Sequence, residues 1–301
     1  MTLGFDTVSF LSDYGTGDEF VGVVKSVIRS IAPHVTVVDI THEIRPYDIK
    51  GGSLTLARSV QYLCPGVVLA VVDPGVGTQR RAVAIEVGDG QSYLVGPDNG
   101  LLASAVGMVG GATAAVELTE PEYQLPAPGA TFAGRDIFAP AAAHLCAGVP
   151  LDALGPRVDV NELVPGLVPL PREEDGALVG EVLWVDRYGN CQLNVDPGEI
   201  DGWGDRVQLR WTRPEVGVRS ARRATAYEEL ASGQVGLVVD SYGLLSVSIP
   251  RASAAETLGL EAGDELALVP LTGGDDTETG GNGAASTSSV SPVTLGPRRP
   301  S

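Results

Sequence analysis

The chain has 301 residues, of which 44% are hydrophobic and 19% charged, a composition typical of globular proteins that is long enough for two domains. Because 38 acidic residues outnumber 20 basic ones, the net charge is −18, which excludes nucleic acid as a partner. The surplus carboxylates either serve solubility or line a site for a cationic ligand, and composition does not separate these alternatives.

The sequence shows no sign of export or membrane insertion. No apolar run approaches the roughly 20 residues that a membrane span needs. The first residues, MTLGFDTVSFLSDYG, lack the basic region and long apolar stretch of a signal peptide. Cys64, Cys146 and Cys191 are odd in number and far apart, which fits neither a disulfide framework nor a zinc site. We therefore expect reduced thiols in a cytoplasmic protein.

In the first half, short β-rich runs alternate with segments of helical periodicity. Strands are expected at 7–13, 35–40, 67–73, 82–87 and 92–96, and helices at 18–32, 47–63 and 135–148. Asp18 is the expected N-cap of the first helix. Continuous apolar strands suit a sheet that is covered on both faces. This alternation predicts an α/β domain with a central sheet flanked by helices.

The pattern changes after residues 164–176, which carry three prolines and turn acidic. From Leu178 on, short strands separated by Gly, Asp and Asn turns predict a small all-β antiparallel barrel or sandwich, and the barrel is the form expected for the second domain. The last segment, 272–301, is rich in Gly, Ser and Thr and has few large apolar side chains. It therefore cannot bury enough apolar surface to offset the entropy cost of folding. The predicted organisation is an α/β domain at 1–165, a linker at 166–177, a barrel domain at 178–271 and a disordered tail at 272–301.

Several carboxylates stand where ligands of α/β sheets bind. Asp13 and Asp73 end predicted strands, where they either cap a helix or turn or contact a ligand, because ligands lie beyond the carboxyl ends of such strands. Arg80 follows Asp73 across a tight loop of Pro and Gly, so the pair either orients a water molecule or closes the loop as an ion pair. In the second half, the turn DRYGN at 186–190 offers a carboxylate, an aromatic ring and an amide, and a hairpin turn explains it equally.

Seven motifs, taken in order, resemble the family of S-adenosylmethionine hydroxide adenosyltransferases, which also includes fluorinases and chlorinases. They are FLSDYGTGDEF, DITHEIRPYD, VDPGVGTQRR, GPDNGLL, TFAGRDIFAPAAAHL, VDRYGN and VVDSYG. The resemblance implies an N-terminal α/β domain, a C-terminal β-barrel and homotrimers that bind S-adenosylmethionine between neighbouring subunits. The implied reaction is attack of water on the ribose C5′, which gives adenosine and L-methionine without a metal or separate cofactor.

The same resemblance implies a set of substrate-binding residues. They are Asp13 at the ribose diol, Asp18 and Asp186 as polar contacts (Asp186 near the methionine ammonium), Tyr47 and Tyr227 packing around the ligand, and Asn190 and Ser241 near the adenine edge. Aromatic rings suit a flat base, because each stacking contact contributes about 1–3 kcal/mol.

Residue 73 separates the branches of the family that this chain resembles, because the halogenating members carry Tyr there. Asp73 is what the hydroxide-using members have, and Arg80 matches the partner that orients it. A carboxylate at the attack point repels halide but suits a water molecule that must lose a proton. Because the sulfonium is a good leaving group, the reaction needs in-line positioning of water more than a strong base.

One position departs from the family pattern. Hydroxide-using relatives commonly read FHGRD, whose His completes a set with the Asp, the Arg and the water, whereas this chain reads FAGRD with Ala133. Neither His34 nor His42 stands at the position of this histidine in the FHGRD motif, and His144 lies further along the following helix. Loss of such a partner typically costs about 10²- to 10⁴-fold in rate. Two rival hypotheses therefore accompany the hydrolase: a protein that binds S-adenosylmethionine or adenosine without turnover, and a halogenase, which Asp73 disfavours.

Overall fold

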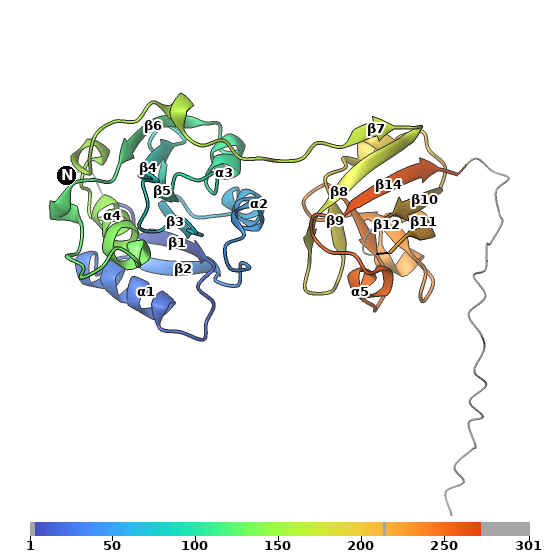
Figure 1. Ribbon diagram of the computed structural model, residues 1–301, viewed down its shortest axis with the longest axis horizontal. Helices are drawn as coiled ribbons and strands as arrows, with labels where there is room; N and C mark the ends of the chain where they lie inside the picture. The colour runs from blue at the N-terminus through green and yellow to red at the C-terminus, as the bar shows by residue number, and fades with distance from the viewer. Residues whose placement is uncertain (1–3, 213–214, 272–301) are drawn as a thin grey trace, which may run out of the picture.

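A computed structural model describes residues 4–212 and 215–271, so the predicted disordered tail lies outside the described residues. Two units follow one another along the chain (Figure 1). The first is an α/β unit built on a six-stranded sheet, and the second is a β-barrel. No helix among the described residues has the length and apolar character needed to cross a membrane.

The α/β unit has a mixed sheet in the order β2-β1-β3-β5-β4-β6. Its strands are β1 (Thr7–Ser12), β2 (Thr36–Thr41), β3 (Val67–Val71), β4 (Ala82–Val87), β5 (Ser92–Pro97) and β6 (Ala112–Glu117). β1, β2, β3 and β5 run parallel, whereas β4 is antiparallel to both of its neighbours. The predicted α/β class is confirmed, and β6 is a strand that the sequence did not reveal.

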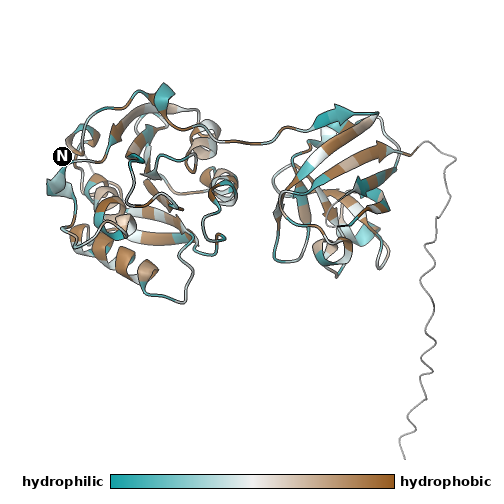
Figure 2. Cartoon of the chain, in the orientation of Figure 1, coloured by the Kyte–Doolittle hydropathy of each residue, from teal (hydrophilic) through white to brown (hydrophobic). Residues whose placement is uncertain are grey.

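Helices cover both faces of this sheet (Figures 1 and 2). They are α1 (Phe20–Ile31), α2 (Ile49–Val60), α3 (Ala103–Met108) and α4 (Ala139–Cys146), with a π-helical turn, η2 (Gly134–Phe138), leading into α4. Because side chains alternate along a strand, Phe10 packs in the cluster with α1 and α4, and Leu11 packs in the cluster with α2. All the large apolar side chains of β3 are buried.

Two local predictions in this unit are wrong. Asp18 does not cap α1, because the helix begins one residue later and Glu19 occupies the N-cap position. The helix expected from residue 47 begins at Ile49, because Tyr47 adopts a left-handed backbone with φ of 69°. Asp48 is the true N-cap, and its Oδ1 accepts a hydrogen bond of 2.8 Å from the Gly51 amide.

The barrel closes through seven strands in the order β14-β10-β11-β12-β13-β9-β8, with β14 pairing back to β8 and β7 lying outside on β8. They are β7 (Arg172–Glu174), β8 (Ala177–Val185), β9 (Cys191–Leu193), β10 (Arg206–Trp211), β11 (Gly217–Ala224), β12 (Gly236–Val239), β13 (Leu245–Ser248) and β14 (Glu265–Pro270). The helix α5 (Ala254–Leu258) follows β13. The predicted barrel is confirmed, but β11 and β12 pair in parallel, so it is not wholly antiparallel.

Short 3-10 turns complete the structure at η1 (Pro121–Tyr123), η3 (Leu151–Ala153), η4 (Val160–Glu162), η5 (Pro197–Ile200) and η6 (Tyr227–Glu229). Residues 164–171, which join the two units, form neither helix nor strand. The units also touch through α2 and β8. Lys50 pairs with Glu181, and the Arg58 guanidinium carbon lies 4.2 Å from the centroid of the Trp184 ring.

Candidate active site

Asp73 and Arg80 form a buried ion pair at the end of β3. Arg80 Nε lies 2.9 and 3.0 Å from the two carboxylate oxygens of Asp73, and its Nη2 donates to Oδ2. The side chains are 6% and 14% exposed, respectively. A tight loop returns Arg80 to the strand end, with Gly77 at φ of 77° and Thr78 Oγ1 donating to the Gly75 carbonyl at 2.7 Å. The predicted meeting of this pair across its loop is what the structure shows.

Asp13 lies beside this pair because β1 and β3 are neighbouring parallel strands. The Asp13 amide donates to the Val71 carbonyl at 3.3 Å, which ties the two strand ends together. Its Oδ2 accepts a hydrogen bond of 2.9 Å from the Tyr47 amide. Partial burial raises the pKa of the Asp13 carboxyl, the Tyr47 hydrogen bond opposes this, and the charge of Asp73 raises the pKa further.

Tyr47 and Asp18, which were also predicted to bind the substrate, are more exposed than Asp13 and Asp73. The Tyr47 ring is 73% exposed, and it is the backbone of this residue that contacts Asp13. Asp18 is exposed on the loop between β1 and α1, and its carboxylate has no hydrogen bond or ion pair among the described residues. Asp13, Tyr47, Asp73 and Arg80 thus come together, whereas Asp18 stands apart on the loop.

A buried histidine holds the loop that carries Asp13. His42 Nδ1 lies 2.8 Å from Ser12 Oγ, and the His42 carbonyl accepts a hydrogen bond of 2.8 Å from the Gly15 amide. The other ring nitrogen, Nε2, is 3.1 Å from Asp39 Oδ1. His42 therefore contacts the chain immediately before and after Asp13. This positioning role of His42 was not predicted, although the residue lies in the motif DITHEIRPYD.

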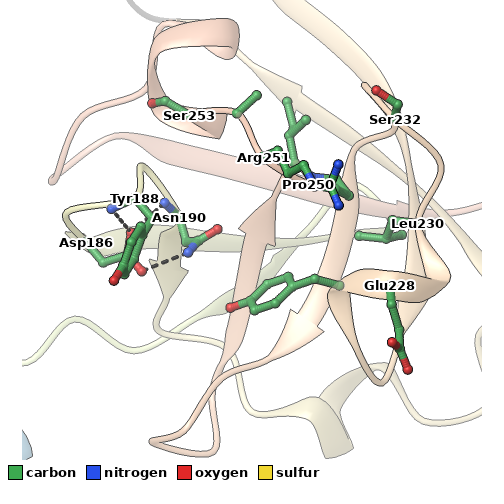
Figure 3. A pocket seen from close by; sticks show the side chains of 12 residues that line it. Asp186, Tyr188, Asn190, Glu228, Leu230, Ser232, Pro250, Arg251 and Ser253 are labelled. Atoms are coloured by element: carbon green, nitrogen blue, oxygen red, sulfur yellow. Dashed lines mark hydrogen bonds between the residues drawn. The ribbon is translucent and has the colours of Figure 1, made fainter.

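In the barrel, the predicted Asp186 and Asn190 form one closed turn (Figure 3). Asp186 Oδ1 accepts hydrogen bonds from the Tyr188 and Asn190 amides at 2.8 and 2.9 Å, and Oδ2 accepts one from Asn190 Nδ2 at 2.8 Å. The turn borders an open pocket of about 1040 Å³. Asp186, Tyr188, Asn190, Tyr227, Arg251 and Ser253 are among its lining residues. The hairpin alternative therefore describes the backbone, and the turn also faces a cavity.

A second pocket, of about 460 Å³, adjoins the first because Asp186, Asn190 and Tyr227 line both. Ser241 lies here, so the four barrel residues predicted from the sequence gather around one hollow. Trp184 and Tyr242 also line it and were missed, although Tyr242 stands in the quoted motif VVDSYG and Trp184 directly precedes the motif VDRYGN. Arg251 was missed because its turn carries no motif.

The two groups of residues stay apart within one chain. Among the described residues, the hydrogen bonds of the Asp13 and Asp73 group stay within the α/β unit, and those of the Asp186 group stay within the barrel. The described part of the chain holds no cluster of three or more His, Cys, Asp or Glu side chains arranged to hold a metal ion.

Both units match one family of proteins. Residues 8–155 match the SAM hydroxide adenosyltransferase N-terminal domain, and residues 180–267 match the C-terminal domain. The chain belongs to the SAM hydroxide adenosyltransferase family. This confirms the resemblance that the seven motifs carried.

Relatives of this chain are named either as hydrolases of S-adenosyl-L-methionine or as fluorinases. Proteins called (R)-S-adenosyl-L-methionine hydrolase from Salinispora tropica and Thermus thermophilus are 43% and 42% identical, covering 86% and 87% of this chain and 96% and 99% of their own length. A fluorinase from an Actinoplanes species is 27% identical, covering 86% of this chain and 96% of its own. A crystal structure of an uncharacterized conserved protein from Thermotoga maritima superposes with a TM-score of 0.78 at 33% identity, covering 87% and 99% of the two chains.

The family member departs from its motif at Ala133, which is 6% exposed and packs in the core against α1 and α4. No histidine replaces the missing one beside Asp73 in the described structure. The His42 ring is bonded to Ser12 and paired with Asp39, and the His144 ring packs against the Tyr123 ring at 5.0 Å.

Proposed function

We propose that this protein hydrolyses S-adenosylmethionine at the ribose C5′, releasing adenosine and L-methionine. The observation that carries the proposal is the buried Asp73 carboxylate gripped by Arg80 at the sheet edge beside Asp13. Relatives that are 41–43% identical over most of the chain are named for this hydrolysis, and the relatives named fluorinase are more distant.

The reaction replaces one bond at carbon. A water oxygen forms a bond to C5′ as the bond from C5′ to the sulfonium breaks, and that electron pair leaves sulfur as the neutral thioether of methionine. The water loses a proton. Asp73 accepts a hydrogen bond from the water and draws its proton away, and Arg80 fixes the plane of the carboxylate. Positioning contributes most, because the sulfonium is already a good leaving group.

Asp13 is proposed to hold the ribose hydroxyls, with Asp18 as a further polar contact and Tyr47 packing around the ligand. In the barrel, Asn190 and Ser241 face the adenine edge, and Tyr227 packs on the ligand. Asp186 binds the methionine ammonium. Its carboxylate already accepts three hydrogen bonds from its own turn, and a carboxylate has about four acceptor positions, so one stays for the ligand.

We further propose a homotrimer with each site between the α/β unit of one subunit and the barrel of the next. The separation of the two residue groups within one chain supports this arrangement. Light scattering measures the subunit number. Mixing Asp73→Ala subunits with Asn190→Ala subunits tests the shared site, because a site formed between subunits regains both residues in some mixed trimers and recovers activity, whereas a site within one subunit recovers none.

The relatives named (R)-S-adenosyl-L-methionine hydrolase suggest which sulfonium configuration is the substrate, and we propose the (R) epimer. We place the enzyme in the cytoplasm, where its three free thiols would stay reduced. The reaction as written requires water and no separate cofactor.

The test is incubation with each sulfonium epimer in halide-free buffer made with ¹⁸O water, followed by chromatography and mass spectrometry. Hydrolysis at C5′ places ¹⁸O in adenosine and none in methionine, and Asp73→Ala abolishes the product. Ligand binding without adenosine would favour the second candidate function, a binding protein, for which Ala133 is the specific observation. A halogenated adenosine that appears only with added chloride or fluoride would favour the halogenase.

A further inference from the structure

Tyr14 follows Asp13 directly, and its ring is fixed by three aromatic neighbours. The ring centroids of Phe10, Phe20 and Phe132 lie 6.5, 5.6 and 5.8 Å from that of Tyr14, and the Phe10 and Phe132 contacts are edge-on. Such packing leaves the ring little freedom and sets the direction in which its hydroxyl points.

The hydroxyl end of this ring rests against Gly134, next to Ala133. A Cβ atom added to Gly134 would stand 2.1 Å from the Tyr14 hydroxyl oxygen but 3.1 Å from the ring carbon that carries it. It is therefore the hydroxyl group of Tyr14 that requires glycine at position 134. With phenylalanine at position 14, an alanine at position 134 would meet only a mild steric conflict with the ring. Among the described residues the hydroxyl has no hydrogen-bond partner. The hydroxyl oxygen keeps some contact with solvent, since it is not among the fully buried polar atoms without a partner, so a water molecule or a ligand group can bond to it.

The charged residues that influence Tyr14 are the ones proposed to act in the reaction, Asp13, Asp73 and Arg80. Burial raises the pKa of the Tyr14 hydroxyl far above its usual range, the carboxylates of Asp13 and Asp73 raise it further, and Arg80 opposes them. Tyr14 therefore stays neutral and able to donate a hydrogen bond at every working pH. The turn η2 places Gly134 under the hydroxyl and Phe138 at 5.3 Å from the Arg80 guanidinium carbon, so one short element contacts both side chains.

We propose that the Tyr14 hydroxyl donates a hydrogen bond to the attacking water held by Asp73, and so takes the place of the histidine that is absent at Ala133. The water then gives one hydrogen to Asp73, receives one hydrogen bond from Tyr14 and keeps a lone pair for C5′. This inference rests on the proposed hydrolysis and names the third group of its catalytic set.

The first experiment compares Tyr14→Phe with Tyr123→Phe, a matched control whose ring packs against His144 in the same unit. Tyr14→Phe should lower kcat about 10- to 100-fold and change KM by less than about 2-fold, because one positioning hydrogen bond is lost while the ring packing stays. Tyr123→Phe should leave kcat unchanged. Far-ultraviolet circular dichroism and the melting temperature check that both variants are folded.

A second pair of variants tests the geometry. Gly134→Ala should lower kcat as far as Tyr14→Phe does, because the added methyl displaces the hydroxyl, and the double variant should be no worse than either single one. Ala133→His in the Tyr14→Phe background should restore part of the lost rate, since the smaller ring leaves room for the imidazole. The pH profile of kcat should keep the same alkaline side in Tyr14→Phe, because the hydroxyl does not ionise there.

The outcomes separate this inference from the proposed function. If the wild type forms adenosine and Tyr14→Phe matches it within about 2-fold, the role of Tyr14 is wrong and the hydrolase stands. If the wild type and all variants form no adenosine from either epimer, both proposals are overturned. A fall in kcat for Tyr123→Phe equal to that for Tyr14→Phe would also refute a specific role for Tyr14.

Discussion

Arg80 Nε lies almost equally far from the two carboxylate oxygens of Asp73, at 2.9 and 3.0 Å, while its Nη2 donates to Oδ2. This fork fixes the carboxylate plane in a way that a single ammonium cannot reproduce. The guanidinium itself is held over the Phe138 ring at 5.3 Å. The direction in which the Asp73 carboxylate points is therefore set by the packing of η2 as well as by its own loop.

Asp73→Asn should lower kcat about 10²- to 10⁴-fold, because the amide keeps the size of the carboxylate but cannot draw a proton from water. Adenosine release measured by chromatography gives the rate, and calorimetric titration with S-adenosylmethionine gives the affinity. The affinity should stay within about 10-fold of the wild type. Unchanged turnover in Asp73→Asn would remove Asp73 from the mechanism, and Asp152→Asn, on the exposed η3 turn, is the control.

Asp13→Asn should make the protein more stable at neutral pH while it weakens ligand binding. Because the pKa of Asp13 is raised in the folded state, folding favours its protonated form, and the carboxylate costs stability once the pH exceeds its ordinary value of 3.8. The melting temperature at pH 7 should rise by no more than about 2–4 °C, since solvent screens a half-exposed group. The difference should vanish below about pH 4, where the carboxyl is protonated in both states. A melting temperature that falls at pH 7 would contradict this.

The sheet and the central ion pair were predictable because both depend on local sequence. Runs of Val, Ile and Leu marked β1, β3 and β4. The Pro and Gly residues between Asp73 and Arg80 favour a tight turn, which brings the two side chains together. By contrast, β6 reads ATAAVE, whose alanines have weak strand preference, and it forms because it pairs with β4.

The parts that were missed depend on residues far apart in sequence. The parallel pairing of β11 with β12 is set by how the barrel closes, which no local pattern records. The position of the Tyr14 hydroxyl depends on the absence of a side chain at Gly134. The N-cap at Asp18 was wrong because α1 begins after Glu19, a shift of one residue that propensity does not resolve.

Arg58→Ala should loosen the contact between the two units more than Lys50→Ala does. Arg58 stacks at 4.2 Å on Trp184, and burial lowers its pKa, whereas Lys50 is 44% exposed in its pair with Glu181. A desolvated cation over an aromatic ring contributes about 0.5–2 kcal/mol, and an exposed ion pair about 0–1 kcal/mol. A double-mutant cycle of Arg58→Ala and Trp184→Ala in urea unfolding should give a coupling in the first range. Zero coupling would mean that the stacking adds nothing.

His42→Ala should destabilise the fold and weaken substrate binding together. It leaves the buried Ser12 hydroxyl without its partner at 2.8 Å, which costs about 1–3 kcal/mol in the free energy of unfolding. Because the His42 ring holds Ser12, the residue before Asp13, while the carbonyl bond to Gly15 is kept in the variant, KM should rise more than kcat falls. His34→Ala is the control, since that side chain is exposed and should change stability by less than about 0.5 kcal/mol. Equal effects of the two variants would refute a positioning role for His42.

The three thiols should differ sharply in reactivity. Burial raises the pKa of Cys146 and of Cys191 to about 12, whereas Cys64 is exposed. Since the thiolate is the reactive form, a disulfide reagent at pH 8 should modify one thiol per native chain rapidly and all three after unfolding in guanidinium. Cys191 follows Asn190 at the barrel pocket, so S-adenosylmethionine bound there should slow its modification further by stabilising the folded barrel. Rapid loss of two or three thiols from the native protein would show that the barrel or α4 opens far more readily than its packing implies.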